Sequence, residues 1–154
     1  MIKSLLFLTA FQYIGVPYKW GGNNFDGLDC SGLVVKVFQD LGILKQGEDY
    51  SAQGLYNWCK GQQGVQSSIA CDSLLFFGRD RNNISHVAIS LGEHDGITLM
   101  LESAGAGRES IGQTRETLLR RDARVRIKPI SHRKDFIEGA IVPYKKIIAY
   151  NREF

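Results

Sequence analysis

The residues of this sequence best suited to nucleophilic chemistry surround Cys30. This cysteine follows a glycine-rich stretch, Tyr18–Leu28, and directly precedes an apolar run with helical spacing. The first turn of a helix carries unpaired N–H groups and the positive end of the helix dipole, and both favour a thiolate. The same N–H groups can hold the oxyanion that forms when a thiolate attacks a carbonyl. Because the flanking Asp29 and Ser31 are poor core formers, we interpret Cys30 as a nucleophile rather than a buried thiol, with both neighbours in the oxyanion and substrate region.

A thiol nucleophile of this kind needs a base, and the base needs a group that fixes its orientation. His86 is the candidate base, because it lies in an alternating strand pattern on the face opposite the apolar residues. His94 and His132 lie in a predicted turn and among charged residues, so we interpret them as solvated. Glu102, on the next predicted strand, is the candidate orienter if its face is shared with His86. A solvated glutamate at a strand end is the alternative, and the pattern does not decide between the two.

The other two cysteines predict no metal site. Cys59 and Cys71 complete an odd total of three, and the sequence contains no CxxC pair. We therefore expect no structural zinc and no cofactor, and we interpret both residues as inert thiols. A Cys59–Cys71 disulfide remains the alternative for a protein of an oxidising compartment.

The elements that must position these groups indicate an α+β fold. Helical patterns come first, and short strand patterns follow them, which is typical of helices packed on an antiparallel sheet. The length of 154 residues fits one domain, residues 1–154. We expect helices over Ser4–Ile14, Cys30–Leu41 and Ala52–Lys60, and strands over Ser73–Gly78, Ser85–Gly92, Ile97–Ser103, Ala123–Ile130 and Gly139–Tyr144.

The charge pattern limits the possible partners. A net charge of +3 argues against a nucleic-acid binder. The segment Arg108–Asp135 nevertheless holds nine basic and four acidic residues, a local charge of +5. A solvated surface is one interpretation, and a patch for an anionic polymer, formed by Arg120, Arg121 and Arg124, is the other.

The N-terminal sequence MIKSLLFLTAF has features of a signal peptide, namely one lysine followed by an apolar run. The run is short and continues into QYIGVPYKWGG, so we interpret it as the first helix of the mature domain. No stretch reaches the roughly 18 apolar residues of a membrane span.

Several motifs together resemble the NlpC and p-sixty family of cell-wall cysteine peptidases. PYKWGG and FDGLDCSGLV match the family's loop and nucleophile helix, and CDSLLFFG and SHVAISLG match its two following strands. The agreement in order and spacing extends over about Ser4–Ala104. Two departures are visible: Glu102 stands where many members have a second histidine, and Cys71-Asp72-Ser73 replaces a Gly-Asp pair before the first strand.

The resemblance implies a papain-like α+β fold and hydrolysis of peptidoglycan stem peptides, typically at a γ-D-glutamyl–diamino-acid bond, at the cell wall. It implies that Cys30 is the nucleophile, His86 the base and Tyr18 a hydroxyl near the oxyanion, although Tyr18 can also simply pack beside Trp20. A bare catalytic domain suits a phage-encoded or tail-associated enzyme. Two alternatives stay open: an acyltransferase or thioesterase of the same superfamily, and a non-catalytic domain that binds the wall or builds a phage tail.

Overall fold

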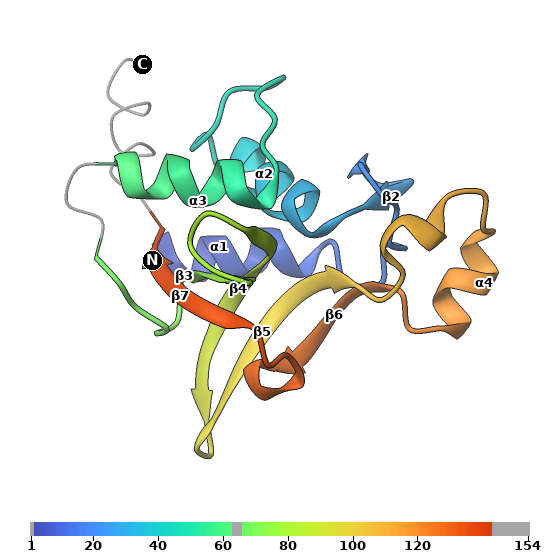
Figure 1. The fold of residues 1–154 in the computed structure, drawn as a ribbon. Coiled ribbons are helices and arrows are strands. Elements are labelled where there is room, and N and C mark those ends of the chain that lie inside the picture. Colours follow the sequence, from blue (N-terminus) through green and yellow to red (C-terminus); the bar gives the residue numbers. More distant parts are fainter. Residues whose placement is uncertain (1, 63–65, 143–154) are drawn as a thin grey trace.

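The computed structural model describes residues 2–62 and 66–142, with side chains from residue 5 onward. Its centre is a five-stranded antiparallel sheet with the strand order β6-β5-β4-β3-β7, and α1, α2 and α3 cover one face of that sheet (Figure 1). This is the expected α+β architecture. The elements are α1 (Ile2–Phe11), β1 (Asn23–Asn24), β2 (Gly27–Leu28), α2 (Cys30–Asp40), α3 (Ala52–Gly61), β3 (Ser73–Gly78), β4 (Ile84–His94), β5 (Ile97–Ala104), α4 (Arg115–Arg120), β6 (Arg124–Pro129) and β7 (Phe136–Ile141), with two short 3-10 turns, Gly107–Ser110 and Ile130–His132.

The α2 helix begins at Cys30 because Asp29 caps it. The Asp29 carboxylate accepts a hydrogen bond of 2.7 Å from the Gly32 N–H, which is one of the N–H groups that a helix leaves unpaired in its first turn. Gly42, with a φ of 69°, follows Leu41 and ends the helix in the left-handed conformation that glycine adopts without strain. The helix therefore ends within one residue of the predicted position.

The main core lies between the helices and the sheet. The α2 residues Leu33, Val34, Val37 and Phe38 are buried against β4 and the rest of a large apolar cluster. The opposite face of the sheet carries a second, smaller cluster of Leu75, Phe77, Ala88 and Met100. Side chains of a strand alternate between these two faces, so the parity of a residue decides which cluster it joins.

The structure differs from the sequence-based expectations at the hairpin between β4 and β5. We predicted that residues 92–96 form a turn, but β4 continues through His94 and only Asp95 and Gly96 form the turn. Both have positive φ, 51° and 77°, which is the backbone that a two-residue Asp-Gly hairpin requires. A bulge between Ser90 and Gly92 shifts the register of the pair.

Three further elements differ from the predictions. The short helix α4 was not predicted, and Thr114 caps its first turn through the Thr117 N–H. The last strand begins at Phe136, three residues before the predicted strand, whose final residues 143 and 144 lie outside the described part of the chain. The predicted first helix ends at Phe11 rather than Ile14. Within residues 2–62 and 66–142, none of the helices is both long and apolar enough to cross a bilayer.

Candidate active site

Cys30 is the first residue of α2 and faces the beginning of β4. Its Sγ lies 3.9 Å from the Ser85 carbonyl oxygen, at the limit for a thiol donor, and the side chain is partly exposed. The N–H groups of Cys30 and Ser31 lie in the first turn, where a helix offers no internal acceptor. The sulfur therefore has donors beside it that can hold a developing oxyanion.

His86 and Glu102 lie on the same face of the sheet, as their parity with Ala88 and Met100 predicts. The His86 Nε2 is 2.8 Å from the Glu102 Oε2, and both side chains are buried. Because Nε2 is engaged by the carboxylate, Nδ1 is the ring nitrogen that remains for proton exchange. The structure thus brings all three predicted catalytic residues together.

Electrostatic interactions favour the charged forms of His86 and Glu102. Burial by itself would lower the pKa of His86, but hydrogen bonding with the Cys30 and Glu102 side chains outweighs burial and raises it. Burial by itself would raise the pKa of Glu102, but the interactions with His86 and Arg126 outweigh burial and lower it. The positive charge of Arg133 acts against the protonated form of His86. A carboxylate beside an imidazolium is therefore the favoured state of the pair.

A pocket of about 370 Å³ opens onto Cys30 and His86. Tyr18 lies in its wall and is itself largely buried, and its pKa is raised by burial and by the negative charges of Cys30 and Asp29. Its hydroxyl thus stays protonated and can donate, although the ring also packs against Leu118 and Ala123. The pocket lining combines polar and apolar side chains: Tyr18, Trp20, Asp29, Cys30, Ser31, Ser51, Ala52, Gln53, Ile84, Ser85, His86, Ala104, Gly105, Gly107 and Arg133.

Asp29 connects the glycine-rich loop to the nucleophile helix. Besides capping α2, its carboxylate accepts hydrogen bonds from the Gly21 N–H at 3.0 Å and the Ser31 hydroxyl at 3.2 Å. Gly32 has to be a glycine, because a Cβ there would lie 2.0 Å from the Gly22 carbonyl oxygen. We had placed Asp29 and Ser31 at the oxyanion and substrate site; both line the pocket, and the geometry gives Asp29 the further task of positioning the loop.

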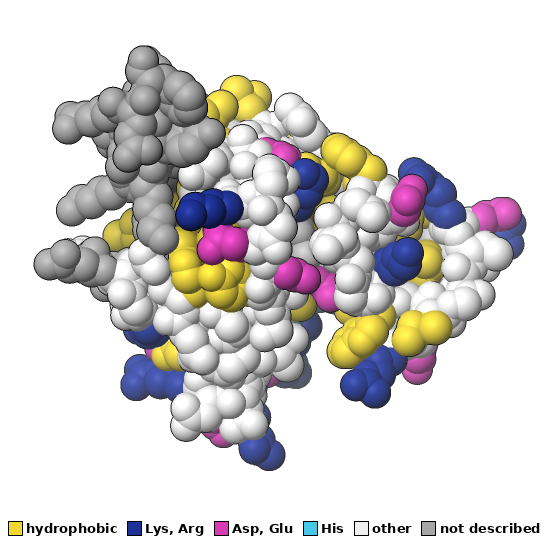
Figure 2. Space-filling view, turned by 90° about the horizontal axis from the view of Figure 1, so that it is seen from above, with side chains coloured by type: hydrophobic (Ala, Val, Ile, Leu, Met, Phe, Trp, Pro, Cys, Tyr) yellow, Lys and Arg dark blue, Asp and Glu magenta, His cyan; other side chains and the backbone are white. Residues whose placement is uncertain are grey.

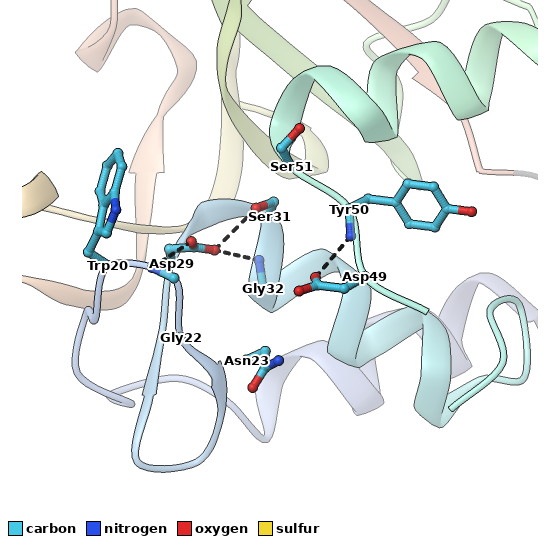
Figure 3. Close-up of a pocket in the computed structure, with 10 residues that line it drawn as sticks. Trp20, Gly22, Asn23, Asp29, Ser31, Gly32, Asp49, Tyr50 and Ser51 are labelled. Carbon is cyan, nitrogen blue, oxygen red and sulfur yellow. Dashed lines mark hydrogen bonds between the residues drawn. The ribbon is translucent and has the colours of Figure 1, made fainter. Parts of the chain in front are cut away.

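A second pocket, of about 300 Å³, adjoins the first (Figure 3). The two share Trp20, Asp29, Ser31 and Ser51, so they form one continuous cleft beside the start of α2. Trp20 stands at one side of the close-up and Tyr50 at the other, with the Asp29 hydrogen bonds between them. Two adjoining pockets can hold more of an extended substrate than one pocket can.

The three arginines of the proposed patch are engaged in ion pairs. Arg120 pairs with Glu116, Arg121 with Glu109 at 3.1 Å and Arg124 with Asp122 at 2.8 Å. On the face seen in Figure 2, Lys and Arg side chains are interspersed with Asp and Glu side chains. Each of the three proposed arginines therefore has an acidic partner within the protein.

Sequence analysis missed Arg126, which contacts Glu102 on the side away from His86. The only feature of the sequence that indicated Arg126 was its position in an alternating strand pattern.

The remaining cysteines lie outside the site. Cys59 is a free thiol buried in the core, so the Cys59–Cys71 disulfide is not formed, and burial raises its pKa to about 12. A thiol with so high a pKa is inert at neutral pH, as expected. Within the described residues, no group of three or more His, Cys, Asp or Glu side chains could hold a metal ion.

A cysteine at a helix N-terminus, facing a histidine on an antiparallel sheet, is the arrangement of a papain-like domain. The model of the NlpC/P60 family matches residues 15–123, and the chain belongs to this family. The fold agrees with the solved structure of RipD from Mycobacterium tuberculosis, which is described as a non-catalytic NlpC/p60 domain protein adapted to peptidoglycan binding. The TM-score is 0.58, with 17% identity over 93% of this chain and 98% of that chain.

Two curated relatives are similar in sequence. A probable endopeptidase of Mycobacterium bovis is 38% identical over 85 residues, which are 55% of this chain and 20% of that protein. The gamma-DL-glutamyl hydrolase of Bacillus subtilis is 38% identical over 86 residues, 54% of this chain and 20% of that protein. The chain thus spans about a fifth of the length of these two relatives.

Proposed function

We propose that the protein is a cysteine peptidase that cleaves peptidoglycan stem peptides through an acyl-enzyme. The observation that carries the proposal is the juxtaposition of Cys30 and His86 in the wall of an open pocket, with the buried Glu102 hydrogen-bonded to His86. Membership in the NlpC/P60 family and relatives named endopeptidase and gamma-DL-glutamyl hydrolase support the class of substrate. The bond cleaved is, in this proposal, the γ-D-glutamyl–diamino-acid bond.

The reaction begins with transfer of the Cys30 proton to Nδ1 of His86. The thiolate attacks the scissile carbonyl carbon, and the N–H groups of the first turn of α2, together with the Tyr18 hydroxyl, hold the oxyanion. His86 then gives its proton to the leaving amine, and a thioester with Cys30 remains. Water, deprotonated by His86, hydrolyses the thioester and restores the thiol. Throughout these steps Glu102 stabilises the imidazolium and fixes its tautomer.

The polar side chains next to Cys30 favour a peptide over the alternative substrates. An acyltransferase or thioesterase acting on lipids needs an extended apolar groove for the acyl chain. The walls next to Cys30 instead carry Ser31, Ser51, Gln53 and Arg133, whose donors and acceptors match amides and carboxylates.

Incubation with defined muropeptides, followed by mass identification of the products, tests the proposal. We expect wild-type protein to yield products of a single hydrolysis at the γ-D-glutamyl bond and Cys30→Ala to yield none while keeping its melting temperature. Turnover by folded Cys30→Ala would reject the mechanism. Binding of muropeptides without turnover by the wild type would assign this chain to the non-catalytic, peptidoglycan-binding kind described for RipD.

An anionic wall polymer is proposed as a second partner, bound through Arg120, Arg121 and Arg124. Because each arginine is already paired with an acid, the local positive charge is reduced and binding should be weak and sensitive to salt. Replacing all three with glutamine should weaken sedimentation with cell walls and leave soluble-peptide turnover unchanged. Unaltered sedimentation would remove this partner.

A further inference from the structure

A buried glutamate in the orienting position creates an electrostatic problem. Glu102 is 1% exposed, and an ionised carboxylate at such a depth is costly unless opposite charge and hydrogen bonds compensate it. His86 alone cannot compensate it throughout a catalytic cycle, because the imidazole must lose its proton to the leaving amine and take it up again. A second, permanent positive charge is required on the other side of the carboxylate.

Arg126 meets this requirement. It lies directly opposite Glu102 in the antiparallel pair of β5 and β6, and its side chain is only 11% exposed. Its Nε and Nη2 each donate to Glu102 Oε1 at 3.2 Å, while Oε2 accepts from His86 at 2.8 Å. The two carboxylate oxygens are thus held from opposite sides by different partners, and the plane of the carboxylate is fixed.

Arg126 is itself held from behind by the turn that precedes β6. Its Nη1 donates to the backbone oxygen of Asp122 at 2.8 Å and to the Asp122 Oδ2 at 3.2 Å. The pKa of Asp122 is lowered to about 2, first by hydrogen bonds from Lys128 and Arg124, so it is ionised at all working pH values. Asp122 has a φ of 55°, and Gly105 packs closely against Ala123 in the same turn. The chain of contacts therefore runs from His86 through Glu102 and Arg126 to a surface turn.

We propose that Arg126 is a positioning residue of the active site, which keeps Glu102 ionised and oriented toward His86 whatever the protonation state of the imidazole. The proposal explains how this chain uses a glutamate where a neutral side chain or a second histidine would need no such partner. Arg126 is not among the described residues that line the pocket, and its contact with the catalytic group is the one to Glu102, so we expect its effect on the reaction to pass through Glu102.

The charged groups around the pair give the expected direction of the pH effect. Glu102 faces His86 on β4 and Arg126 on β6; His86 faces Cys30 on α2 and Glu102 on β5, with Arg133 and its partner Asp135 nearby on the segment before β7. Without Arg126, burial acts on Glu102 with less opposition, and the carboxylate takes up a proton at higher pH. Protonated Glu102 no longer stabilises the imidazolium, so the reactive thiolate–imidazolium pair is lost at higher pH than in the wild type.

Only the peptidase assay of this inference rests on the proposed function. Two measurements therefore distinguish a failure of the inference from a failure of the proposed function. The first is the alkylation rate of Cys30 by iodoacetamide as a function of pH, followed by mass mapping of the Cys30 peptide, which needs no substrate. The second is kcat/KM for a soluble muropeptide over the same pH range. For Arg126→Met we expect the acid limb of both profiles to move to higher pH and both rates near pH 6 to fall about 10- to 100-fold, as for loss of a charge-assisted contact.

Matched variants exclude a general loss of structure. Arg79→Met removes an exposed arginine that pairs with Asp80 at 3.5 Å and takes no part in the contacts from His86 to Asp122, and it should leave both profiles unchanged. In a Glu102→Gln background, adding Arg126→Met should cost little further activity, because the two residues act as one unit. An Arg126→Met profile that superimposes on the wild type, or a full additional loss in the Glu102→Gln background, would overturn the proposal.

If the Arg126→Met variant does not fold, the Arg126→Lys variant tests the positioning role. Lysine keeps the charge but cannot supply two donors to one oxygen, so we expect a smaller shift of the acid limb in the same direction. An Arg126→Lys profile identical to the wild type would overturn the positioning role. Absence of muropeptide turnover in the wild type, with a shifted alkylation profile in the variants, would reject the proposed function and keep this inference.

Discussion

Replacement of Asp29 by alanine is expected to lower the free energy of unfolding by about 0.5–3 kcal/mol. Loss of a helix N-cap costs about 0.5–2 kcal/mol, and here the lost contact is the 2.7 Å bond to the Gly32 N–H. The Gly21 N–H also loses its acceptor, but Gly21 is exposed and water replaces the carboxylate, so we add only about 0–1 kcal/mol. The Ser31 hydroxyl turns to another acceptor at little cost.

Urea unfolding of the whole chain measures this loss, and thermal unfolding should show it as about 2–4 °C per kcal/mol. Ser51→Ala is the matched control, because Ser51 caps α3 through the single N–H of Gly54 and holds no loop. Asp29→Asn keeps a capping oxygen and should recover most of the stability. The glycine-rich loop forms one wall of the cleft, so Asp29→Ala should also lower kcat/KM more than Ser51→Ala does. If Asp29→Ala is no more destabilising than Ser51→Ala and leaves kcat/KM unchanged, the loop is held by other contacts and the reasoning fails.

Three further predictions follow from the site and the core. Glu102→Gln removes a group that raises the pKa of His86, so the alkaline limb of the kcat/KM profile should move to lower pH, with a loss of at least about tenfold at neutral pH; an unchanged profile would reduce Glu102 to a structural residue. Stability should decrease on both sides of neutrality. The contribution of Glu102 to the free energy of unfolding is present above its usual pKa of 4.5 and is lost as pH falls through its lowered pKa. The contribution of His86 is complete below its usual pKa of 6.5 and is lost as pH rises through its raised pKa. Urea midpoints across a pH series check both contributions, and Glu102→Gln should flatten the acid side of the series. Phe76→Ala should cost about 3–5 kcal/mol, because the ring is fully buried and packs edge-on against Tyr56 at 5.2 Å; a loss below about 1 kcal/mol would show that the core closes around the cavity.

The sequence predicts those parts of the site that depend on local pattern. The start of α2 was predicted from the apolar spacing after Cys30, a signal that lies within a few residues, and the Asp29 cap agrees with it. The shared face of His86 and Glu102 follows from strand parity, because a strand has a period of two whatever its partner is.

The parts that could not be predicted depend on which strands pair and in which register. Nothing local in the sequence sets Arg126 opposite Glu102, since the two are 24 residues apart and α4 lies between them. A count of charges gives the net charge of the basic segment, but it does not show that Arg121 and Glu109 meet. The hairpin turn was placed too early because Glu93 and His94 are polar, yet the exposed end of a strand accepts polar residues as readily as a turn does.

The order of strands bears on how the protein can be shortened. Both edges of the sheet, β6 and β7, come from residues after 123, where the match to the family model ends. A fragment trimmed to the matched region would present β5 and the wholly buried β3 as bare edges with unpaired backbone groups, which invites aggregation. It would also lack Arg126, so the buried Glu102 carboxylate would lose its permanently charged partner. Expression and crystallisation should therefore retain the chain through at least Val142.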